Sequence, residues 1–444
     1  MGWQQRLRTG ARGRFRREVR RDVVSVVAVV GMVGLVATLV LRSSERPVVK
    51  VSEEGAAGHG CRRPYAAFGP WNTPIPAGAR TDPSRTLPPG QLTSDPTQYT
   101  YPVYDVSGAT PAVTVRIRDT YSNVVSPTRL EKQFQVRVRV PLPTGAVPSG
   151  GSDGQLVLVR PKTGDEWGFW RLDRVSGEWS ATNAYHFNTR WSGVPPPGFG
   201  SRGAGVPYLA GLIRRCEIER GHIDHALALA YAHPSPAFVY PARKSDGLGS
   251  ADRDFPEGTR LQLDPSLGGA DLAALGIAGP ALTIARALQK YGAYVVDNSG
   301  HAKLYAEDDL TANWRGLLTS ATVRSIPVSA FRAVVDERPT TRALSARGTS
   351  GSRIDLRYVV LDGGQTREAI VVMRHATVIA RLRSGFHDAS RGLVSTVTWR
   401  PPAGLAGSLR FCVTSTDAAG QLSAPTCASL NLQRGDGSST AGRA

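Results

Sequence analysis

The stretch Val113-Thr114-Val115-Arg116-Ile117-Arg118 alternates apolar and polar side chains without a break, and residues 134–140 (FQVRVRV) repeat the pattern. Because successive side chains of a strand point to opposite faces, a period of two predicts strands with one buried face. Segments rich in Pro and Gly, at residues 141–154 and 195–205, separate such stretches. We therefore expect residues 61–326 to form one large, mainly β domain of the sandwich or jelly-roll type.

Two further segments of this region have a readable pattern. Residues 280–292 predict its one notable helix, because proline stands near the start, glycine stands at the end and apolar residues recur at helical spacing. Residues 225–231 are rich in alanine and leucine, which also suits a helix. Their strict alternation favours a strand, with His225 and the leucines on one face and the alanines on the other.

The C-terminal region changes to short, evenly spaced apolar segments. Such spacing over about a hundred residues is typical of a β-sandwich, which we place at residues 327–434, with a disordered tail at 435–444. The predicted strands are 354–361, 369–373, 378–382, 395–399, 409–414 and 428–432. Residues 409–420 and 423–425 resemble the last hairpin of an immunoglobulin-like or fibronectin type III module. The resemblance implies a spacing or binding role rather than catalysis.

The N-terminal region predicts a membrane anchor. Residues 23–41 are nineteen uncharged, mostly apolar residues, enough for a helix to cross a bilayer. Residues 1–22 carry eight arginines against Glu18 and Asp22, which predicts a cytoplasmic tail. Residues 42–60 then form a linker, and the protein is a single-pass cell-membrane protein with extracellular C-terminal domains. A cleaved signal peptide is the alternative, but its apolar region is usually shorter, and residues 41–45 lack a small-x-small site.

The four cysteines of an exported chain predict two disulfides. Three connectivities are possible, and the simplest joins Cys412 to Cys427, which leaves Cys61 with Cys216. The sequence has no Cys-x-x-Cys or His-Glu-x-x-His pattern, so we predict no metal site and no cofactor.

The charge balance bears on partners. Formal net charge is +18, of which the cytoplasmic tail contributes 6. A basic chain is compatible with nucleic-acid binding, but the predicted export argues against that partner. The remaining excess is scattered arginine, which suits anionic polymers at a cell surface. An acidic polysaccharide is therefore the expected partner, besides the membrane itself.

Aromatic residues are concentrated between residues 167 and 191. Indole rings suit stacking on sugar rings, which makes this region a candidate substrate-binding site. Its tryptophans are Trp167, Trp170, Trp179 and Trp191. In a strand Trp167 and Trp170 take opposite faces, so they do not all serve one site. Core packing is the alternative for each of them.

A second group of residues suggests catalysis. His225, Tyr240, Arg243 and Asp246 offer a base and an arginine that neutralises a uronate, as a polysaccharide lyase requires. A buried, satisfied core histidine is the alternative for His225. Paired carboxylates are what a glycosidase needs, and Glu217, Asp246 and Asp297 are candidates for such a pair.

Five segments together resemble a family of exported actinobacterial proteins that is similar in setting to carbohydrate-active proteins. The segments are 68–76 (FGPWNTPIP), 221–227 (GHIDHAL), 239–242 (VYPA), 256–261 (PEGTRL) and 291–298 (YGAYVVDN). The resemblance implies a β-rich extracellular domain with a glycan-related role and assigns no catalytic residue.

Two functional hypotheses follow from these patterns. The first is a membrane-anchored extracellular protein that acts on polysaccharide as a glycan-cleaving enzyme. The second is a non-catalytic glycan-binding or cell-envelope scaffold protein. A protease or esterase is weaker, because the few histidines sit in no recognisable triad context.

Overall fold

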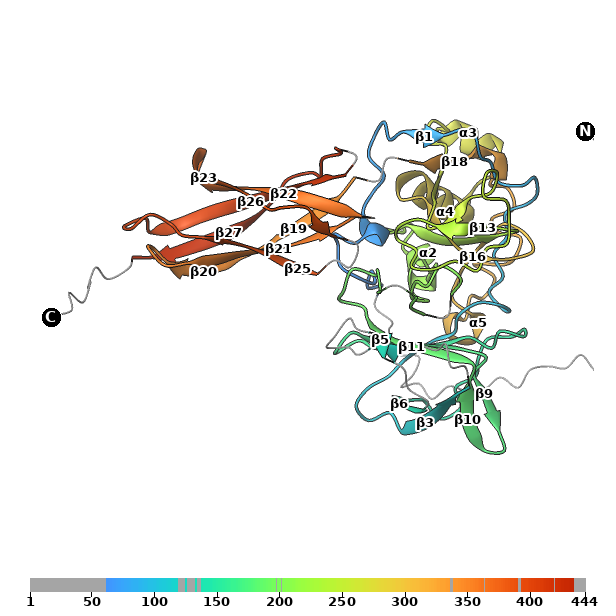
Figure 1. Ribbon diagram of the computed structural model, residues 1–444. Helices are drawn as coiled ribbons and strands as arrows, with labels where there is room; N and C mark the ends of the chain where they lie inside the picture. The colour runs from blue at the N-terminus through green and yellow to red at the C-terminus, as the bar shows by residue number, and fades with distance from the viewer. Residues whose placement is uncertain are drawn as a thin grey trace, which may run out of the picture. The chain divides into compact units, whose positions relative to one another are not determined.

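The computed structural model describes residues 61–434 except 119–123, 126–131, 134–136, 197, 201, 336–337, 363, 390–392 and 419. The predicted cytoplasmic tail, membrane anchor, linker and C-terminal tail lie outside the described residues. In the described part, strands greatly outnumber helices, which confirms the mainly β prediction (Figure 1). No helix of this part has the length and apolar composition needed to cross a membrane.

A six-stranded mixed sheet forms the first part of the large region. Its order is β1 (Thr81–Asp82), β18 (Phe331–Val334), β15 (Arg260–Leu263), β16 (Ala293–Asn298), β12 (Leu227–Tyr231) and β17 (Lys303–Leu304). The alanine- and leucine-rich segment is strand β12, as its alternation predicts, and it runs parallel to β16. Leu227 and Leu229 face one buried cluster and Ala228 and Ala230 face another. This strand is therefore buried on both faces.

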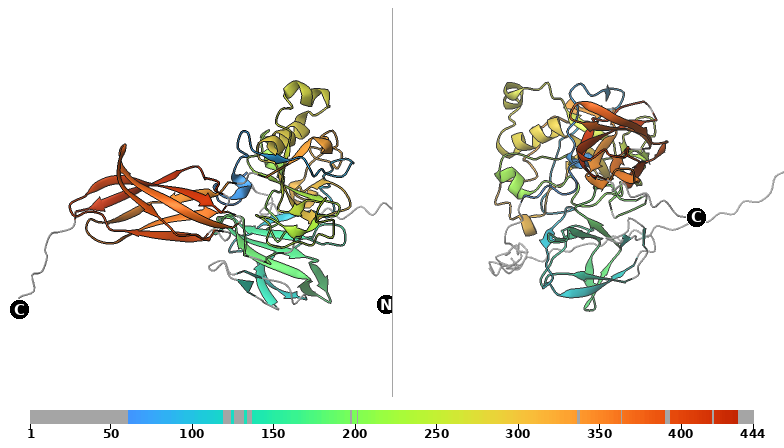
Figure 2. Two further views of the ribbon diagram at one scale, coloured as in Figure 1. Left: turned by 45° about the horizontal axis from the view of Figure 1, so that its top comes forward. Right: turned by 90° about the vertical axis from the view of Figure 1, so that its left-hand side faces the viewer.

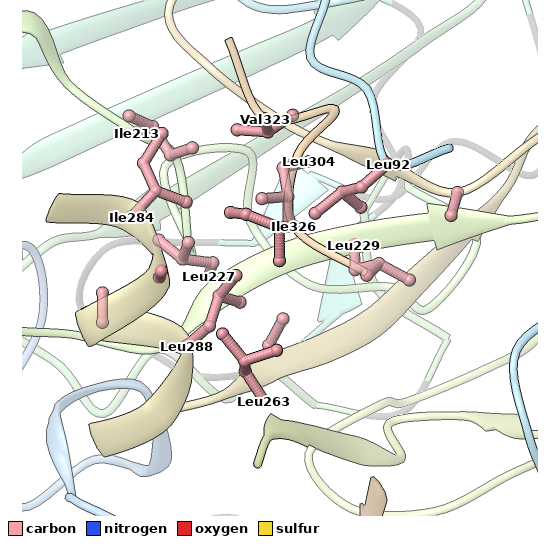
Figure 3. Close-up of a cluster of buried hydrophobic side chains, with 14 of the residues drawn as sticks. Leu92, Ile213, Leu227, Leu229, Leu263, Ile284, Leu288, Leu304, Val323 and Ile326 are labelled. Atoms are coloured by element: carbon pink, nitrogen blue, oxygen red, sulfur yellow. The ribbon is translucent and has the colours of Figure 1, made fainter. Parts of the chain in front are cut away.

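The leucine face of β12 is covered by helix α4 (Gly279–Lys290), which matches the predicted helix. Figure 3 shows Ile284 and Leu288 of α4 against Leu227 and Leu263 of the sheet. The three other helices are short: α2 (Arg215–Glu219), α3 (Gly269–Ala274) and α5 (Asp309–Ala312). Two single 3₁₀ turns, η1 (Pro70–Asn72) and η2 (Val328–Ala330), complete the helical elements of the described residues.

A separate β-sandwich follows from the alternating segments. One sheet has the order β6 (Arg137–Pro141), β3 (Ala112–Ile117), β10 (Glu178–Ala181) and β9 (Asp173–Val175). The other has the order β11 (Asn183–Asn188), β8 (Asp165–Trp170), β7 (Leu156–Arg160) and β2 (Val103–Asp105). The alternation at 113–118 is confirmed, since Val115 and Ile117 are buried between the sheets while Thr114 and Arg116 are exposed.

The large region therefore differs from the single sandwich or jelly roll that we predicted. The sandwich accounts for the alternating strands only, and a helix-covered mixed sheet accounts for the rest. Strand alternation reveals one buried face, but β12 is buried on both, and its neighbours come from distant parts of the chain. Two small two-stranded ladders complete the region: β4 (Val124–Val125) with β5 (Lys132–Gln133), and β13 (Ser235–Phe238) with β14 (Pro256–Glu257).

The C-terminal region is an Ig-like β-sandwich with its own core, and its two layers are visible in Figure 2. One sheet contains β19 (Thr340–Leu344), β21 (Ile354–Leu361) and β25 (Val394–Trp399). The other contains β20 (Ala346–Thr349), β27 (Thr426–Gln433), β26 (Gly407–Asp417), β22 (Gln365–Arg374) and β23 (Thr377–Arg383), with β24 (His387–Asp388) beside β22. All six predicted strands are present. The sequence placed the boundary between the two domains at 326/327, which lies before β18. Strand β18 belongs to the mixed sheet, because it pairs there with β15 and β1.

Both predicted disulfides are confirmed. Cys412 and Cys427 face each other on the neighbouring strands β26 and β27. Cys61 is bonded to Cys216, which lies on α2, 155 residues later in the chain.

Candidate functional site

Three carboxylates from separate segments meet beside the mixed sheet. Asp246 lies in the loop after β13, Glu257 ends β14, and Asp297 lies near the end of β16. One oxygen of each lies within 4.8 Å of one oxygen of each other. Asp246 is exposed, Asp297 is partly exposed and Glu257 is fully buried. The carboxylate cluster, as we call these three residues, thus extends from solvent into the protein.

Backbone hydrogen bonds hold the three segments together. The N–H of Gly258, next to Glu257, donates to Val295 O of β16 at 2.7 Å. The N–H of Ala204 donates to Val296 O at 2.9 Å, and the N–H of Arg243 donates to Ala204 O at 2.7 Å. The loop around Ala204 therefore bridges β16 and the segment that leads to Asp246.

Gly203 allows the carboxylates to approach so closely. A Cβ atom on this residue would lie 2.5 Å from Glu257 Oε1 and 2.6 Å from Asp246 Oδ1. Both separations are shorter than real Cβ contacts, so the absence of a side chain at Gly203 is a condition for this geometry.

Glu257 is the most perturbed acid of the cluster. Its carboxylate oxygens are buried, and the polar side chains that act on them are the carboxylate of Asp246 and the hydroxyl of Ser245, which donates to Ser235 O at 3.1 Å. Burial raises the pKa of Glu257 to about 9, and the charges of Asp246 and Asp297 add to the rise. Glu257 is therefore protonated at neutral pH.

Asp297 has an intermediate environment. Burial, followed by the charge of Asp246, raises its pKa to about 7. Two donors oppose this rise: Tyr305 Oη donates to Asp297 Oδ2 at 3.2 Å, and the N–H of Asn298 donates to Oδ1 at 3.1 Å. The positive charge of Arg202 also lowers the pKa. Asp297 consequently titrates near neutral pH, well below Glu257.

Arg202 is a buried cation whose charge acts on Asp297. Only 1% of its surface is exposed. Its guanidinium lies 4.8 Å from the ring centre of Tyr101 and 4.9 Å from that of Tyr305. Its N–H groups donate to Tyr101 Oη and to the carbonyl oxygens of residues 207, 208 and 210. Arg202 therefore fixes the ring of Tyr305, which in turn holds Asp297.

The predicted base His225 lies elsewhere, in the core of the protein, with 1% of its surface exposed. Its Nε2 is 3.0 Å from Glu217 Oε1 and its Nδ1 is 2.9 Å from Ala226 O. Burial lowers the pKa of His225, but the charge and hydrogen bond of Glu217 outweigh it and the net pKa is raised. Both ring nitrogens are engaged, as expected for a satisfied core histidine. Because Glu217 is paired with His225, it does not act together with Asp246 or Asp297, the other two acids that the sequence suggested for a carboxylate pair.

Tyr240 and Arg243 line a pocket with Phe238, Val239 and Arg260. The three residues of the carboxylate cluster are not among those that line it. Of the four candidate catalytic residues, only Asp246 therefore belongs to the cluster, together with Asp297 from the proposed acid pair.

The four candidate sugar-binding tryptophans are dispersed. Trp167 is buried in the sandwich and stacks on His186, with ring centres 4.7 Å apart. Trp170 is partly exposed, and the guanidinium of Arg171 lies 4.5 Å from its ring centre. Trp179 packs beside the sandwich core, and Trp191 packs edge-on against Phe187. The structure does not gather them on one surface.

Carboxylate oxygens are the ligands that Ca²⁺ and Mg²⁺ prefer, so the cluster could hold a divalent cation in competition with the proton of Glu257.

Residues 150–154 match Gly-x-Ser-x-Gly, but they form a bend and turn before strand β7. The strand-to-helix elbow of a serine hydrolase is not formed there.

Sequence reasoning missed Glu257. Its segment, PEGTRL, contributed to the family resemblance, but no periodicity marks this glutamate as a partner of Asp246 or Asp297. The sequence did contain one signal: Glu257 stands between Pro256 and Gly258, shortly before strand β15.

No protein-family model and no curated protein matches the chain. Among solved structures it is similar to fibronectin(III)-like modules of CbhA from Clostridium thermocellum, with 12% identity over 22% of this chain and 100% of that chain, TM-score 0.16. It is also similar to the PKD domain of an M14-like peptidase from a Thermoplasmatales archaeon, with 9% identity over 22% of this chain and 94% of that chain, TM-score 0.16. A third is Drosophila N-cadherin EC1-3, with 10% identity over 78% of this chain and 100% of that chain, TM-score 0.19. At these scores the likenesses carry no inference about activity.

Proposed function

We propose that the protein is an exported glycan hydrolase whose reaction takes place at the carboxylate cluster. The supporting observation is that three carboxylates lie within 4.8 Å of one another while their surroundings give Glu257 and Asp297 different raised pKa values. Acids whose environments separate their pKa values are the usual basis of an acid and base pair.

The three acids take different roles in this proposal. Asp246, the exposed member, attacks the anomeric carbon as the glycosidic C–O bond breaks. Asp297 gives its proton to the leaving oxygen, since a pKa of about 7 keeps that proton available at neutral pH. Asp297 then takes a proton from water, whose oxygen displaces Asp246 and releases the sugar.

Glu257 is a positioning residue rather than a catalytic one. It is fully buried and neutral at neutral pH, so it lowers the total negative charge beside Asp246. The nearest oxygens of Asp246 and Asp297 are no more than 4.8 Å apart, which is closer than the about 6.5 to 9.5 Å of inverting glycosidases and favours a retaining reaction.

The substrate class rests on the setting. Two disulfides indicate an oxidising compartment outside the cytoplasm, and the predicted anchor at residues 23–41 would hold the enzyme at the cell surface. The surplus of arginine favours a polysaccharide with acidic groups.

A non-catalytic glycan-binding or scaffold protein is the second candidate. The full burial of Glu257 favours it, because a buried acid also occurs in sites that serve structure alone. An activity screen separates the two candidates.

The test is a screen of neutral and uronate-containing polysaccharides, read by the release of reducing ends and by the absorbance of unsaturated products. Asp246→Asn should abolish reducing-end release without lowering the melting temperature. Asp252→Asn is the matched control, since this exposed aspartate of the same loop region lies outside the cluster. Unsaturated products would indicate a lyase instead. Binding without product would support the scaffold, and equal activity of both variants would remove the cluster from the reaction.

A further inference from the structure

One face of the Ig-like domain carries an array of positive charges. In the sheet of β20, β22, β23, β26 and β27, alternate residues point outward, and five of those are arginines. All five are exposed: Arg347, Arg367, Arg381, Arg383 and Arg410. We call this surface the arginine face. The residues between them, such as Ile370, Val372 and Phe411, point inward to the core.

The strand register spreads these arginines over the whole sheet. Arg381 is paired with Val371 and Arg383 with Ala369 across β22 and β23. Arg410 is paired with Met373 across β22 and β26, and Arg347 with Asn431 across β20 and β27. Neighbouring strands lie about 4.8 Å apart and alternate residues about 6.6 Å apart along a strand. The five guanidinium groups thus form a two-dimensional array rather than a single contact.

At one edge of the array, the exposed carboxylate of Asp388 on β24 stands beside Gln365 of β22. The acids of these five strands are Glu368 and Asp417, and both are buried rather than outward. Glu368 is satisfied within the domain, accepting hydrogen bonds from hydroxyl groups that include Thr366 Oγ1 at 2.8 Å and Ser384 Oγ at 2.7 Å. Of the five arginines, Arg367 lies 5.2 Å from the ring centre of Phe386, and none forms an ion pair in the described part of the chain.

The chemistry of the face identifies the kind of partner. The flat guanidinium fork binds carboxylate, sulfate or phosphate groups through two parallel hydrogen bonds. Between the arginines stand Thr414, Thr416, Ser429 and Asn431, whose hydroxyl and amide groups suit sugar hydroxyls. The outward positions of these five strands hold no aromatic ring, and the exposed ring beside them, Phe386, already lies against the Arg367 guanidinium, so the face offers no series of rings on which nucleic-acid bases could stack. We infer that the arginine face binds an anionic polysaccharide.

This inference goes beyond the proposed hydrolysis, because binding at the Ig-like domain does not require the carboxylate cluster. The face would hold a long acidic chain by several exposed contacts, each individually weak. Such a surface raises the local concentration of polymer for a site on the same chain.

The test measures the affinity of the full-length protein for polygalacturonate of defined length, with dextran as the neutral polymer. The variant Arg381→Ser/Arg383→Ser/Arg410→Ser removes three charges from the face. The matched control, Arg353→Ser/Arg357→Ser/Arg400→Ser, removes three exposed arginines of the other sheet and its ends. We expect about tenfold weaker binding for the first variant, less than threefold for the control and no binding to dextran. Binding should also weaken with salt less steeply in the first variant than in the wild type.

Several outcomes would overturn the inference. Equal losses in the two triple variants would mean that net charge, not this face, attracts the polymer. Tighter binding of single-stranded DNA than of polygalacturonate would identify a nucleic-acid surface, and no binding by the wild type would remove the partner. Comparing the affinity for polygalacturonate with the affinities for sulfated and phosphorylated polymers identifies which anionic group the arginine face prefers. Asp246→Asn should bind normally, so failure of the hydrolase proposal is distinguishable from failure here.

Discussion

Replacing Glu257 with glutamine tests the charge state at the centre of the carboxylate cluster. Glutamine keeps the shape of a protonated glutamate and cannot ionise. In the unfolded chain Glu257 titrates at its ordinary value of 4.5, whereas in the folded protein its pKa is about 9. Between these values the folded chain holds a proton that the unfolded chain has released.

The sign and size of the effect follow from proton linkage. Where the folded state binds the extra proton, the free energy of unfolding falls by about 1.4 kcal/mol for each pH unit. The contribution of Glu257 is fully present below pH 4.5 and is lost as the pH rises toward 9. Between pH 4.5 and pH 7, the free energy of unfolding of the wild type should therefore fall by about 3 kcal/mol more than that of Glu257→Gln.

The assay is urea unfolding of the wild type and Glu257→Gln at several pH values between 5 and 9. The quantity of interest is the difference in unfolding free energy between the two proteins, since other groups titrate equally in both. Glu178→Gln, at an exposed position of β10, serves as the control and should show no such trend. If the curves of wild type and Glu257→Gln run parallel across this range, Glu257 is not protonated in the folded protein and the charge distribution inferred here is wrong.

Two other variants test the structure away from the cluster. His225→Ala should lower the free energy of unfolding by about 3 to 5 kcal/mol, because the buried Glu217 loses its 3.0 Å side-chain partner and keeps the Arg214 N–H and the more distant Arg220 guanidinium. An unchanged melting temperature with lost turnover would instead identify His225 as a catalytic base. Cys412→Ala opens a loop of 15 residues and should destabilise the Ig-like domain by about 3 kcal/mol, measured by thermal unfolding. A loss confined to the large region would contradict that assignment.

The elements that sequence predicts well are those whose pattern is local. Strand β3 and the first half of β21 alternate because one face of each is buried, and that periodicity is visible without any partner. Helix α4 is marked by Pro280 and Gly292 at its ends. The disulfide between Cys412 and Cys427 follows from proximity in one hairpin.

The elements that it misses depend on distant pairing. Strand β12 shows no polar face because both of its faces are covered, and β16 and β17 pair with its two edges. Its sequence pattern therefore does not indicate which sheet it belongs to. The carboxylate cluster combines one loop and the ends of two strands, and the missing constraint is the close approach that Gly203 allows. Without that contact, the partner of Asp246 cannot be chosen among the chain's acids.

The most direct test of the proposed reaction is the anomeric configuration of the first product released from a cleaved glycan, followed by proton NMR in real time. The short separation of the carboxylates predicts that the new reducing end first appears with the configuration of the bond that was cleaved, and that Asp246→Asn releases no product. A first product of inverted configuration, or wild-type turnover by Asp246→Asn, would contradict the assignment of the reaction to Asp246 and Asp297.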